Sequence, residues 1–314
     1  MTGAGASTPA DRGRPPESDD APSVSSRPDI AAAVEALTAA RPPLLVVADF
    51  DGTLAAGSRD PAVARIDPLA QRSLRGLART AATGPPRAHV AVLTGRVVAD
   101  VATRVRVGGV EYLGDHGLQH GHLPRGGRAE RLAVVTDPAY DVHLDPAETL
   151  ASGVAAELGR PEWLFVERKG PSVAFHVRQA DDVAAARAAV IDAIAAVERR
   201  VGLVHGLAHY RGRSVVDLRP RDAGGKREAV DGLIDRHRPG GVVALGDELS
   251  DIDAFEGVVD ARAAGRIHVG VTVAVHGASR PAPRELQAVA DLRIAGAHDV
   301  GRFLAALARR LADA

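Results

Sequence analysis

Short apolar runs alternate with alanine-rich helical patterns over most of the chain. Residues 44–48, 89–93 and 242–245 are apolar runs of strand length, and each is followed by a polar, glycine-containing turn. A helical pattern begins at Pro68, because Asp67 suits the N-cap, proline suits the first helical position, and apolar residues then recur three to four positions apart. This alternation of strands and helices predicts a parallel sheet covered by helices.

The middle of the chain has a different pattern. Residues 163–178 and 203–218 each predict two strands joined through a glycine turn, and an alanine-rich helix at 181–200 separates them. We therefore expect an inserted α+β domain at 118–221. Further predicted elements are a strand at 111–113, helices at 226–237, 251–256 and 299–312, and strands at 267–275 and 292–294.

The predicted fold class is α/β, with one Rossmann-like domain formed by the flanking segments 29–117 and 222–314. Its parallel sheet is expected to be flanked by helices. Residues 1–28 are rich in Gly, Ser, Pro and Asp, a composition that cannot offset the entropy of ordering, so we expect a disordered tail. A length of 314 residues, 46% of them hydrophobic, suits two domains at a prior of roughly 150 residues each.

Charge and composition narrow the possible partners. A formal net charge of -1 gives no electrostatic footprint for nucleic acid or an anionic membrane. The chain has no cysteine, which excludes disulfides, thiolate nucleophiles and cysteine-based zinc sites. It also has no run of about 18 apolar residues, the length a membrane span needs. We expect a cytoplasmic monomer that acts on a small molecule.

Two carboxylates directly follow the first predicted strand. Asp49 and Asp51 are two residues apart, so an extended backbone sends both side chains the same way, and Gly52 permits a tight turn. Two like charges so close need a cation or a proton, and Mg²⁺ takes one or two carboxylates together with phosphate oxygens. One carboxylate could attack an electrophile while the other protonates the leaving oxygen. A solvated Asp-Gly turn is the alternative.

Polar groups also follow the second predicted strand and begin a later helix. In an open parallel sheet, ligands bind beyond the carboxyl ends of the strands. Thr94, Gly95 and Arg96 could cradle an anion with a hydroxyl and backbone N–H groups, although Thr-Gly is also an ordinary turn. Lys226 is one of two lysines among 39 basic residues and would bring a point charge to a helix N-terminus. A surface or capping role is the alternative.

An acidic cluster follows the strand at 242–245. Asp247 comes directly after that strand and a glycine, where it could share a cation with Asp49. Asp251, one helical turn later, could orient Lys226 or a water on the metal. An acidic helix start favoured by the helix dipole is the alternative explanation.

In chain order, these residues resemble the four motifs of the haloacid dehalogenase superfamily of phosphotransferases. The motifs are Asp-Phe-Asp-Gly-Thr-Leu at 49–54, Thr-Gly-Arg at 94–96, the late Lys226, and Gly-Asp-Glu-Leu-Ser-Asp at 246–251. The resemblance implies Asp49 as nucleophile, Asp51 as general acid/base, phosphate contacts from Thr94, Gly95, Arg96 and Lys226, and Mg²⁺ held by Asp49, Asp247 and the Asp51 carbonyl, with Asp251 behind them. It covers roughly 44–117 and 222–300.

Segments of the insertion resemble the cap of trehalose-6-phosphate phosphatases. They are residues 167–169, 172–178 and 212–220, together with 114–117 and 250–255 in the flanking domain. The resemblance implies a specificity cap with substrate contacts from His116, Glu167, Lys169, Arg178 and Asp217. The chain departs from the family's usual residues at two positions, with Glu248 where an Asp is common and Asp217 where a Glu is commoner. Both positions stay negatively charged. A carboxylate can accept adjacent sugar hydroxyls in pairs, which suits Glu167 and Asp217.

The activity that the resemblance implies is Mg²⁺-dependent hydrolysis of trehalose 6-phosphate through an aspartyl-phosphate intermediate. Two other functions stay open at this point. One is a phosphatase for another glycosyl phosphate, such as sucrose phosphate or mannosyl-3-phosphoglycerate. The other is a catalytically silent module that binds a sugar phosphate. The charged cap residues could also be ordinary cross-strand ion pairs.

Overall fold

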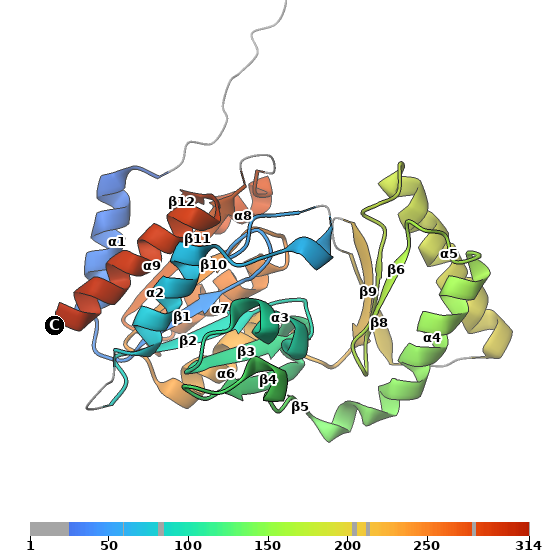
Figure 1. Cartoon of the computed structure of the whole chain (residues 1–314), viewed down its shortest axis with the longest axis horizontal. Helices are drawn as coiled ribbons and strands as arrows, with labels where there is room; N and C mark the ends of the chain where they lie inside the picture. Colours follow the sequence, from blue (N-terminus) through green and yellow to red (C-terminus); the bar gives the residue numbers. More distant parts are fainter. Residues whose placement is uncertain are drawn as a thin grey trace, which may run out of the picture.

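The computed structural model describes residues 25–58, 60–80, 85–202, 206–211, 214–277 and 281–313. It consists of two domains that lie side by side, each built on its own sheet (Figure 1). Most of the tail expected at 1–28 lies outside the described residues. The end of that range was wrongly assigned, because a capping box between Ser26 and Asp29 starts helix α1 at Arg27.

The larger domain, called the core domain below, has an eight-stranded sheet. Its strands are β1 (Leu44–Ala48), β2 (Ala88–Leu93), β3 (Val110–Gly114), β4 (Gln119–Leu123), β5 (Val135–Thr136), β10 (Gly241–Gly246), β11 (Val269–His276) and β12 (Leu292–Ala295). Their order is β12-β11-β10-β1-β2-β3-β4-β5, parallel from β12 to β3 and antiparallel at β4 and β5. The predicted α/β class with a parallel sheet is confirmed.

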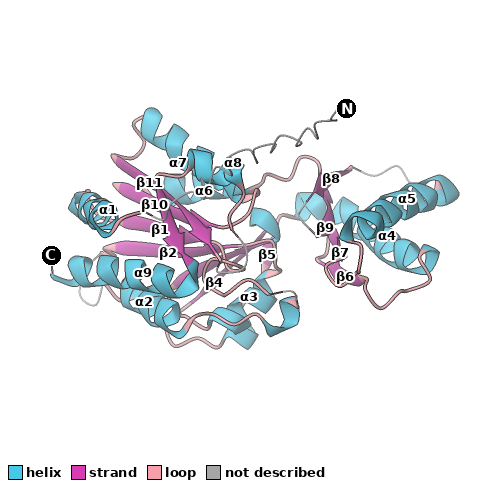
Figure 2. Cartoon of the chain, turned by 90° about the horizontal axis from the view of Figure 1, so that it is seen from above, coloured by secondary structure: helices cyan, strands magenta, loops and turns pink. Residues whose placement is uncertain are grey.

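Helices bury both faces of this sheet (Figure 2). One face is covered by α1 (Arg27–Ala39), α2 (Pro68–Ala78), α3 (Val98–Val105) and α9 (Gly296–Asp313), and the other by α6 (Lys226–His237), α7 (Asp251–Ala263) and α8 (Arg284–Val289). In β1, Leu44, Val46 and Ala48 pack on the first face, while Leu45 and Val47 pack on the second. Burial on both sides explains why this strand is a continuous apolar run.

The smaller domain, called the cap below, has its own hydrophobic core. Its antiparallel sheet has the order β6-β7-β9-β8, with strands β6 (Phe165–Arg168), β7 (Val173–His176), β8 (Leu207–Arg211) and β9 (Val215–Pro220). Helices α4 (Leu144–Glu157) and α5 (Val183–Val201) cover one face, where Val173, Phe175, Val216 and Leu218 are buried. Figure 2 shows that the opposite face is turned toward the core domain.

The insertion begins later than predicted. β4 pairs antiparallel with β3, for example Tyr112 with Gly121, and β5 pairs with β4. Residues 119–136 therefore belong to the core sheet, and the predicted start of the insertion at 118 is wrong. The strand at 119–123 is Gln-His-Gly-His-Leu, so it carries too few apolar residues for its pattern to reveal it.

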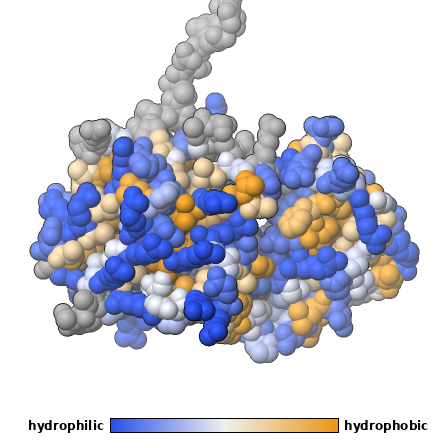
Figure 3. Space-filling model, in the orientation of Figure 1, coloured by the Kyte–Doolittle hydropathy of each residue, from blue (hydrophilic) through white to orange (hydrophobic). Residues whose placement is uncertain are grey.

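Within the described ranges, no helix combines the length and the apolar character needed to cross a membrane. Figure 3 shows hydrophilic and hydrophobic residues interspersed over the visible face of both domains. Short 3₁₀ segments at Pro61–Val63, Asp115–Gly117, Ala129–Arg131 and Pro138–His143 complete the regular structure outside the helices and strands.

Candidate active site

One cavity lies between the carboxyl end of the core sheet and the open face of the cap sheet. It has a volume of about 1130 Å³, and both domains line it. The core domain contributes the residues that follow β1, β2, β3 and β10, and the cap contributes alternate residues of β6, β7 and β9. Since ligands of open parallel sheets bind at this edge, the cavity is the candidate active site.

Three buried carboxylates meet where β1 and β10 end. Asp49, Asp247 and Asp251 each place one oxygen within 4.8 Å of the others. Two glycines leave the room that this needs. A Cβ on Gly52, whose φ is +83°, would lie 2.0 Å from Asp247 Oδ2, and a Cβ on Gly246 would lie 2.2 Å from the Asp251 carboxyl carbon.

Lys226 binds this carboxylate cluster from the first position of α6. Its Nζ donates to Asp49 Oδ1 at 2.9 Å and to Asp251 Oδ1 at 2.6 Å. Asp251 Oδ2 accepts the backbone N–H groups of Asp247 and Glu248, each at 3.0 Å. Burial lowers the pKa of Lys226, but the two carboxylates raise it more, so its pKa stays above the ordinary value and the amine stays charged.

The carboxylate cluster fits a hard divalent cation. The pKa of Asp49 is raised to about 8, mainly by burial; Lys226 acts to lower it, and Asp251 and Asp51 add to the rise. Acidic residues also outnumber basic ones among the residues that line the cavity. A bound cation would stabilise the ionised carboxylates and so lower the pKa that burial and like charge raise. Converging carboxylate oxygens, with space left by two glycines, are the donors that such an ion prefers.

Thr94 and Gly95 lie where β2 ends, and both line the cavity. Thr94 is buried, and its Oγ1 accepts the backbone N–H of Arg96 at 3.3 Å. A Cβ on Gly95 would lie 2.9 Å from His116 Nε2, so glycine allows the imidazole to approach this turn. The predicted anion cradle therefore has His116 as a close neighbour.

The Arg96 side chain binds two carboxylates. Its Nε and Nη2 donate to the two oxygens of Asp51 at 2.5 and 2.8 Å, and its Nη1 donates to Asp100 Oδ2 at 2.7 Å. Burial lowers the pKa of Arg96, but hydrogen bonds with Asp51 and Asp100 raise it above its ordinary value. A phosphate contact by this side chain stays a prediction, and Asp100 was not predicted to take part in the site.

Lys169 connects the cap to the core domain. It lies at the β6–β7 hairpin, and its buried Nζ lies 3.3 Å from Asp115 Oδ1 of the core domain and 3.3 Å from Asp217 Oδ1 of the cap. The Ser172 hydroxyl, also in the hairpin, donates to Asp115 Oδ2. Burial lowers the pKa of Lys169, but the carboxylates raise it above its ordinary value. One cation thus bridges two carboxylates from different domains.

His116 and Asp217 face each other across the same boundary, with Nε2 and Oδ2 3.4 Å apart. His116 has a φ of +59° and follows Asp115 at +49°, a left-handed pair that is uncommon outside glycine. Burial lowers the pKa of His116 to about 4, although Asp217 acts to raise it. Burial raises the pKa of Asp217, but Lys169, His116 and Arg219 hold it below its ordinary value.

Glu167 and Arg178 also line the cavity from the cap. Glu167 Oε2 lies 2.9 Å from His176 Nε2 on the neighbouring strand. Burial acts to raise the pKa of Glu167, but the His176 hydrogen bond and Lys169 hold it below the ordinary value. Arg178 Nη1 donates to the backbone oxygen of Ser58 at 2.7 Å, a second contact between cap and core.

Sequence reasoning missed several residues that build this boundary. Asp115 lies in the segment 114–117, which was noted for its resemblance but not assigned a role. Gln119 holds the β6–β7 hairpin by donating to the Lys169 backbone oxygen at 2.9 Å. Arg219 lies on the same strand face as Asp217, and its guanidinium stacks on Tyr210 at 3.7 Å from the ring centroid. The period of two along β9 was the available signal for Arg219.

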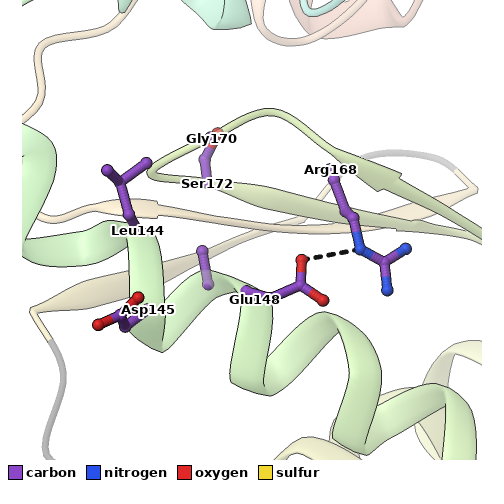
Figure 4. Close-up of a pocket in the computed structure, with 7 residues that line it drawn as sticks. Leu144, Asp145, Glu148, Arg168, Gly170 and Ser172 are labelled. Carbon is purple, nitrogen blue, oxygen red and sulfur yellow. Dashed lines mark hydrogen bonds and ion pairs between the residues drawn. The ribbon is translucent and has the colours of Figure 1, made fainter.

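A smaller cavity of about 300 Å³ lies on the α4 side of the β6–β7 hairpin (Figure 4). Its lining residues are Leu144, Asp145, Ala147, Glu148, Arg168, Gly170 and Ser172. Glu148 accepts a hydrogen bond from Arg168 Nε at 2.8 Å, and both side chains are exposed. Such a surface pair fixes the hairpin on the helix but contributes little stability.

The acidic site at the carboxyl end of the sheet and the inserted cap define the class: the fold is haloacid dehalogenase-like. The solved C-terminal domain of Candida albicans trehalose-6-phosphate phosphatase superposes with a TM-score of 0.69 at 19% identity, covering 91% of this chain and 97% of that one. The C-terminal domain of a Candida albicans trehalose synthase regulatory protein superposes with a TM-score of 0.63 at 14% identity, covering 88% and 97%. At such identities the likeness concerns the fold alone.

A family model described as trehalose-phosphatase matches residues 47–287, and the chain belongs to that family. Among its relatives, a trehalose-phosphate phosphatase from Mycobacterium avium is 37% identical over 216 residues, which is 67% of this chain and 50% of that protein. One from Mycobacterium leprae is 32% identical over 231 residues, or 71% and 49%. The chain spans about half the length of these relatives.

A longer relative carries a different description. A Mycobacterium tuberculosis protein described as an uncharacterized glycosyl hydrolase is 33% identical over 287 residues, which is 88% of this chain and 19% of that protein. Similarity to this chain therefore also occurs within a protein that is about five times as long as the aligned segment.

Proposed function

We propose that this chain is a Mg²⁺-dependent phosphatase that hydrolyses trehalose 6-phosphate to trehalose and phosphate. The observation that carries the proposal is the meeting of Asp49, Asp247 and Asp251 around the buried Lys226, at the edge of the core sheet that faces the cap. Membership of the trehalose-phosphatase family supports the choice of substrate.

Asp49 is the proposed nucleophile. Its carboxylate oxygen attacks the phosphorus in line with the bridging oxygen, which forms an aspartyl phosphate as the bond to the sugar oxygen breaks. Lys226 donates to Asp49 and would stay beside the transferring group, where its charge stabilises the equatorial oxygens. Thr94 and the N–H of Gly95 would provide further donors to the phosphate.

Asp51 is the proposed general acid/base. In the first step it gives its proton to the departing sugar oxygen, and in the second it takes a proton from the water that cleaves the aspartyl phosphate. The carboxylates of Asp49 and Asp247, with the backbone carbonyl of Asp51, would hold Mg²⁺, and Asp251 would keep Asp247 and Lys226 in place through its hydrogen bonds. When bound, the ion offsets the negative charge of the phosphate.

The cap would bind the glucose ring that does not carry the phosphate. Glu167 and Asp217 are ionised acceptors that face the cavity and suit adjacent hydroxyl groups. Lys169, Arg178 and the neutral His116 would add donors around them. Closure of this face on the core domain would exclude bulk water from the reacting phosphate.

Measuring phosphate release from several sugar phosphates tests this proposal. Phosphate release should be fastest with trehalose 6-phosphate, slower with sucrose 6-phosphate and glucose 6-phosphate, and lost when Mg²⁺ is removed with a chelator. Faster release from another glycosyl phosphate, such as mannosyl-3-phosphoglycerate, would replace the substrate but keep the chemistry. Binding of trehalose 6-phosphate without any release would favour the silent module.

We also propose that the enzyme acts as a cytoplasmic monomer on a free sugar phosphate, without nucleic acid or membrane partners. The net charge of -1 supports the absence of nucleic acid and membrane partners, because neither nucleic acid nor an anionic membrane would be attracted to the molecule. Light scattering during size-exclusion chromatography reads the mass directly, and twice the 32.5 kDa of the chain would contradict the monomer.

A further inference from the structure

A row of ion pairs extends from Asp51 into helix α3. Arg96 bridges Asp51 and Asp100, as described above. On the far side, Arg104 Nε donates to both oxygens of Asp100 at 2.8 Å. Arg104 Nη1 also donates to the backbone oxygens of Ala62 at 3.0 Å and Ala64 at 2.8 Å, which lie in the segment that follows the first motif.

The charged side chains of this row are largely buried and are held by their contacts with one another. The side chains of Arg96, Arg104 and Asp100 are 11%, 19% and 31% exposed. Asp100 and Arg104 are one turn apart on α3, and Asp100 also lies one turn after Arg96. Burial raises the pKa of Asp100, but hydrogen bonds from Arg104 and Arg96 hold it below its ordinary value, so it stays ionised.

Arg96 alone would be a poor support for Asp51. In the resting arrangement both Asp51 oxygens accept from Arg96, so Asp51 must turn at least one of them toward the leaving oxygen during the reaction. A largely buried guanidinium that lost its partner would cost several kcal/mol. Asp100 is bound by Arg96 Nη1, which does not contact Asp51, so this bond would remain during that movement, and Arg104 fixes Asp100 on the helix.

We infer that Asp100 and Arg104 are positioning residues for the acid/base Asp51, because they anchor Arg96 in place while Asp51 moves between its salt bridge and the leaving group. The inference rests on the proposed function, in which the sugar oxygen receives a proton from Asp51. Neither residue belongs to the four motifs that carry the resemblance. Both lie on α3, the amphipathic helix that follows the second motif.

The leaving group of the substrate tests this inference. A sugar alkoxide needs the proton from Asp51, whereas p-nitrophenolate leaves without it. For Asp100→Asn and Arg104→Gln, we expect kcat/KM for trehalose 6-phosphate to fall about tenfold or more, a fraction of the full value of general acid catalysis. We expect kcat/KM for p-nitrophenyl phosphate to stay within about twofold, and KM for trehalose 6-phosphate to change little.

Equal losses on both substrates would overturn the inference, because they would indicate general damage to the phosphate site, and so would no loss on either. Arg104→Lys keeps the charge and should recover part of the sugar phosphate activity. Arg302→Gln, in an exposed pair with Asp299 on α9, is the matched control and should change neither value. If Asp100→Asn does not fold, the loss in Arg104→Gln and the partial recovery in Arg104→Lys test the same inference.

A failure of the proposed function gives a different result. If the wild-type protein cleaves glucose 6-phosphate or sucrose 6-phosphate but not trehalose 6-phosphate, the assignment of trehalose 6-phosphate as the substrate is contradicted. The comparison with p-nitrophenyl phosphate can still be made with that alkyl phosphate, and it still decides the role of Asp100 and Arg104.

Discussion

At the scale of single residues, the candidate site depends on side chains that follow two adjacent strands and begin one helix. Asp49, Asp247 and Lys226 meet as parallel-strand geometry requires, because the carboxyl ends of β1 and β10 are adjacent in the sheet. The partners of Arg96 were not predictable, because the contact with Asp51 joins positions 45 residues apart through one choice of side-chain rotamer. The catalytic roles of these residues stay predictions.

Glu111 is a further residue that the sequence did not single out, and it carries a prediction about pH. This buried carboxylate on β3 accepts from His120 at 2.9 Å and from Arg236 at 2.5 Å, and it also contacts His237. Burial raises its pKa, but these hydrogen bonds and charges lower it far below the ordinary 4.5. A depressed carboxyl contributes stability above its ordinary pKa and loses it as the pH falls toward the folded-state value.

Replacing Glu111 by Gln should therefore lower the free energy of unfolding at pH 7 by about 1.5–3 kcal/mol, the range for hydrogen bonds to a charged group. The difference from wild type should shrink progressively below pH 4.5, the ordinary value for this carboxyl. Urea unfolding at several pH values measures it. A difference that is constant from pH 7 to pH 3 would contradict the assignment, and Glu130→Gln at an exposed pair is the control.

Elements with strong periodicity were predicted and those with weak signals were missed. The helix from Pro68 has the expected Asp67 N-cap, whose Oδ1 accepts the N–H of Leu69 at 2.7 Å and of Ala70 at 3.1 Å. Helix α4 was not predicted although Ala147, Leu150, Ala151 and Val154 recur three to four positions apart, and Gly153 in its interior weakens that pattern. β4 and β5 were missed because they are polar or very short.

The β6–β7 hairpin makes a prediction at the scale of an element, because its Lys169 lies between two buried carboxylates. Lys169→Met would leave Asp115 and Asp217 facing each other without their cation, so we expect a loss of about 3–5 kcal/mol in the free energy of unfolding. Arg168→Met, the exposed neighbour on the other side of the hairpin, should cost less than about 1 kcal/mol. Chemical denaturation with both variants decides it, and equal losses would contradict the buried bridge.

At the scale of the whole molecule, the account depends on how two separate cores enclose one cavity. The core domain supplies the acidic cluster and Lys226, and the cap supplies the sheet face with Glu167 and Asp217. The sequence predicted both units from a change of pattern, but their boundary depended on β4 and β5 pairing with the core sheet. A fold of this kind is compatible with catalysis or with regulation, so the chemistry of Asp49 has to be measured.

The most direct measurement is phosphate release from trehalose 6-phosphate, with Mg²⁺ present, by wild-type protein and by Asp49→Asn. The account predicts steady release by wild type and none above background by the variant, because the amide removes the nucleophile while the fold is kept. Asp299→Asn, in the exposed pair on α9, should match wild type. Turnover by a folded Asp49→Asn variant at the wild-type rate would contradict the central claim.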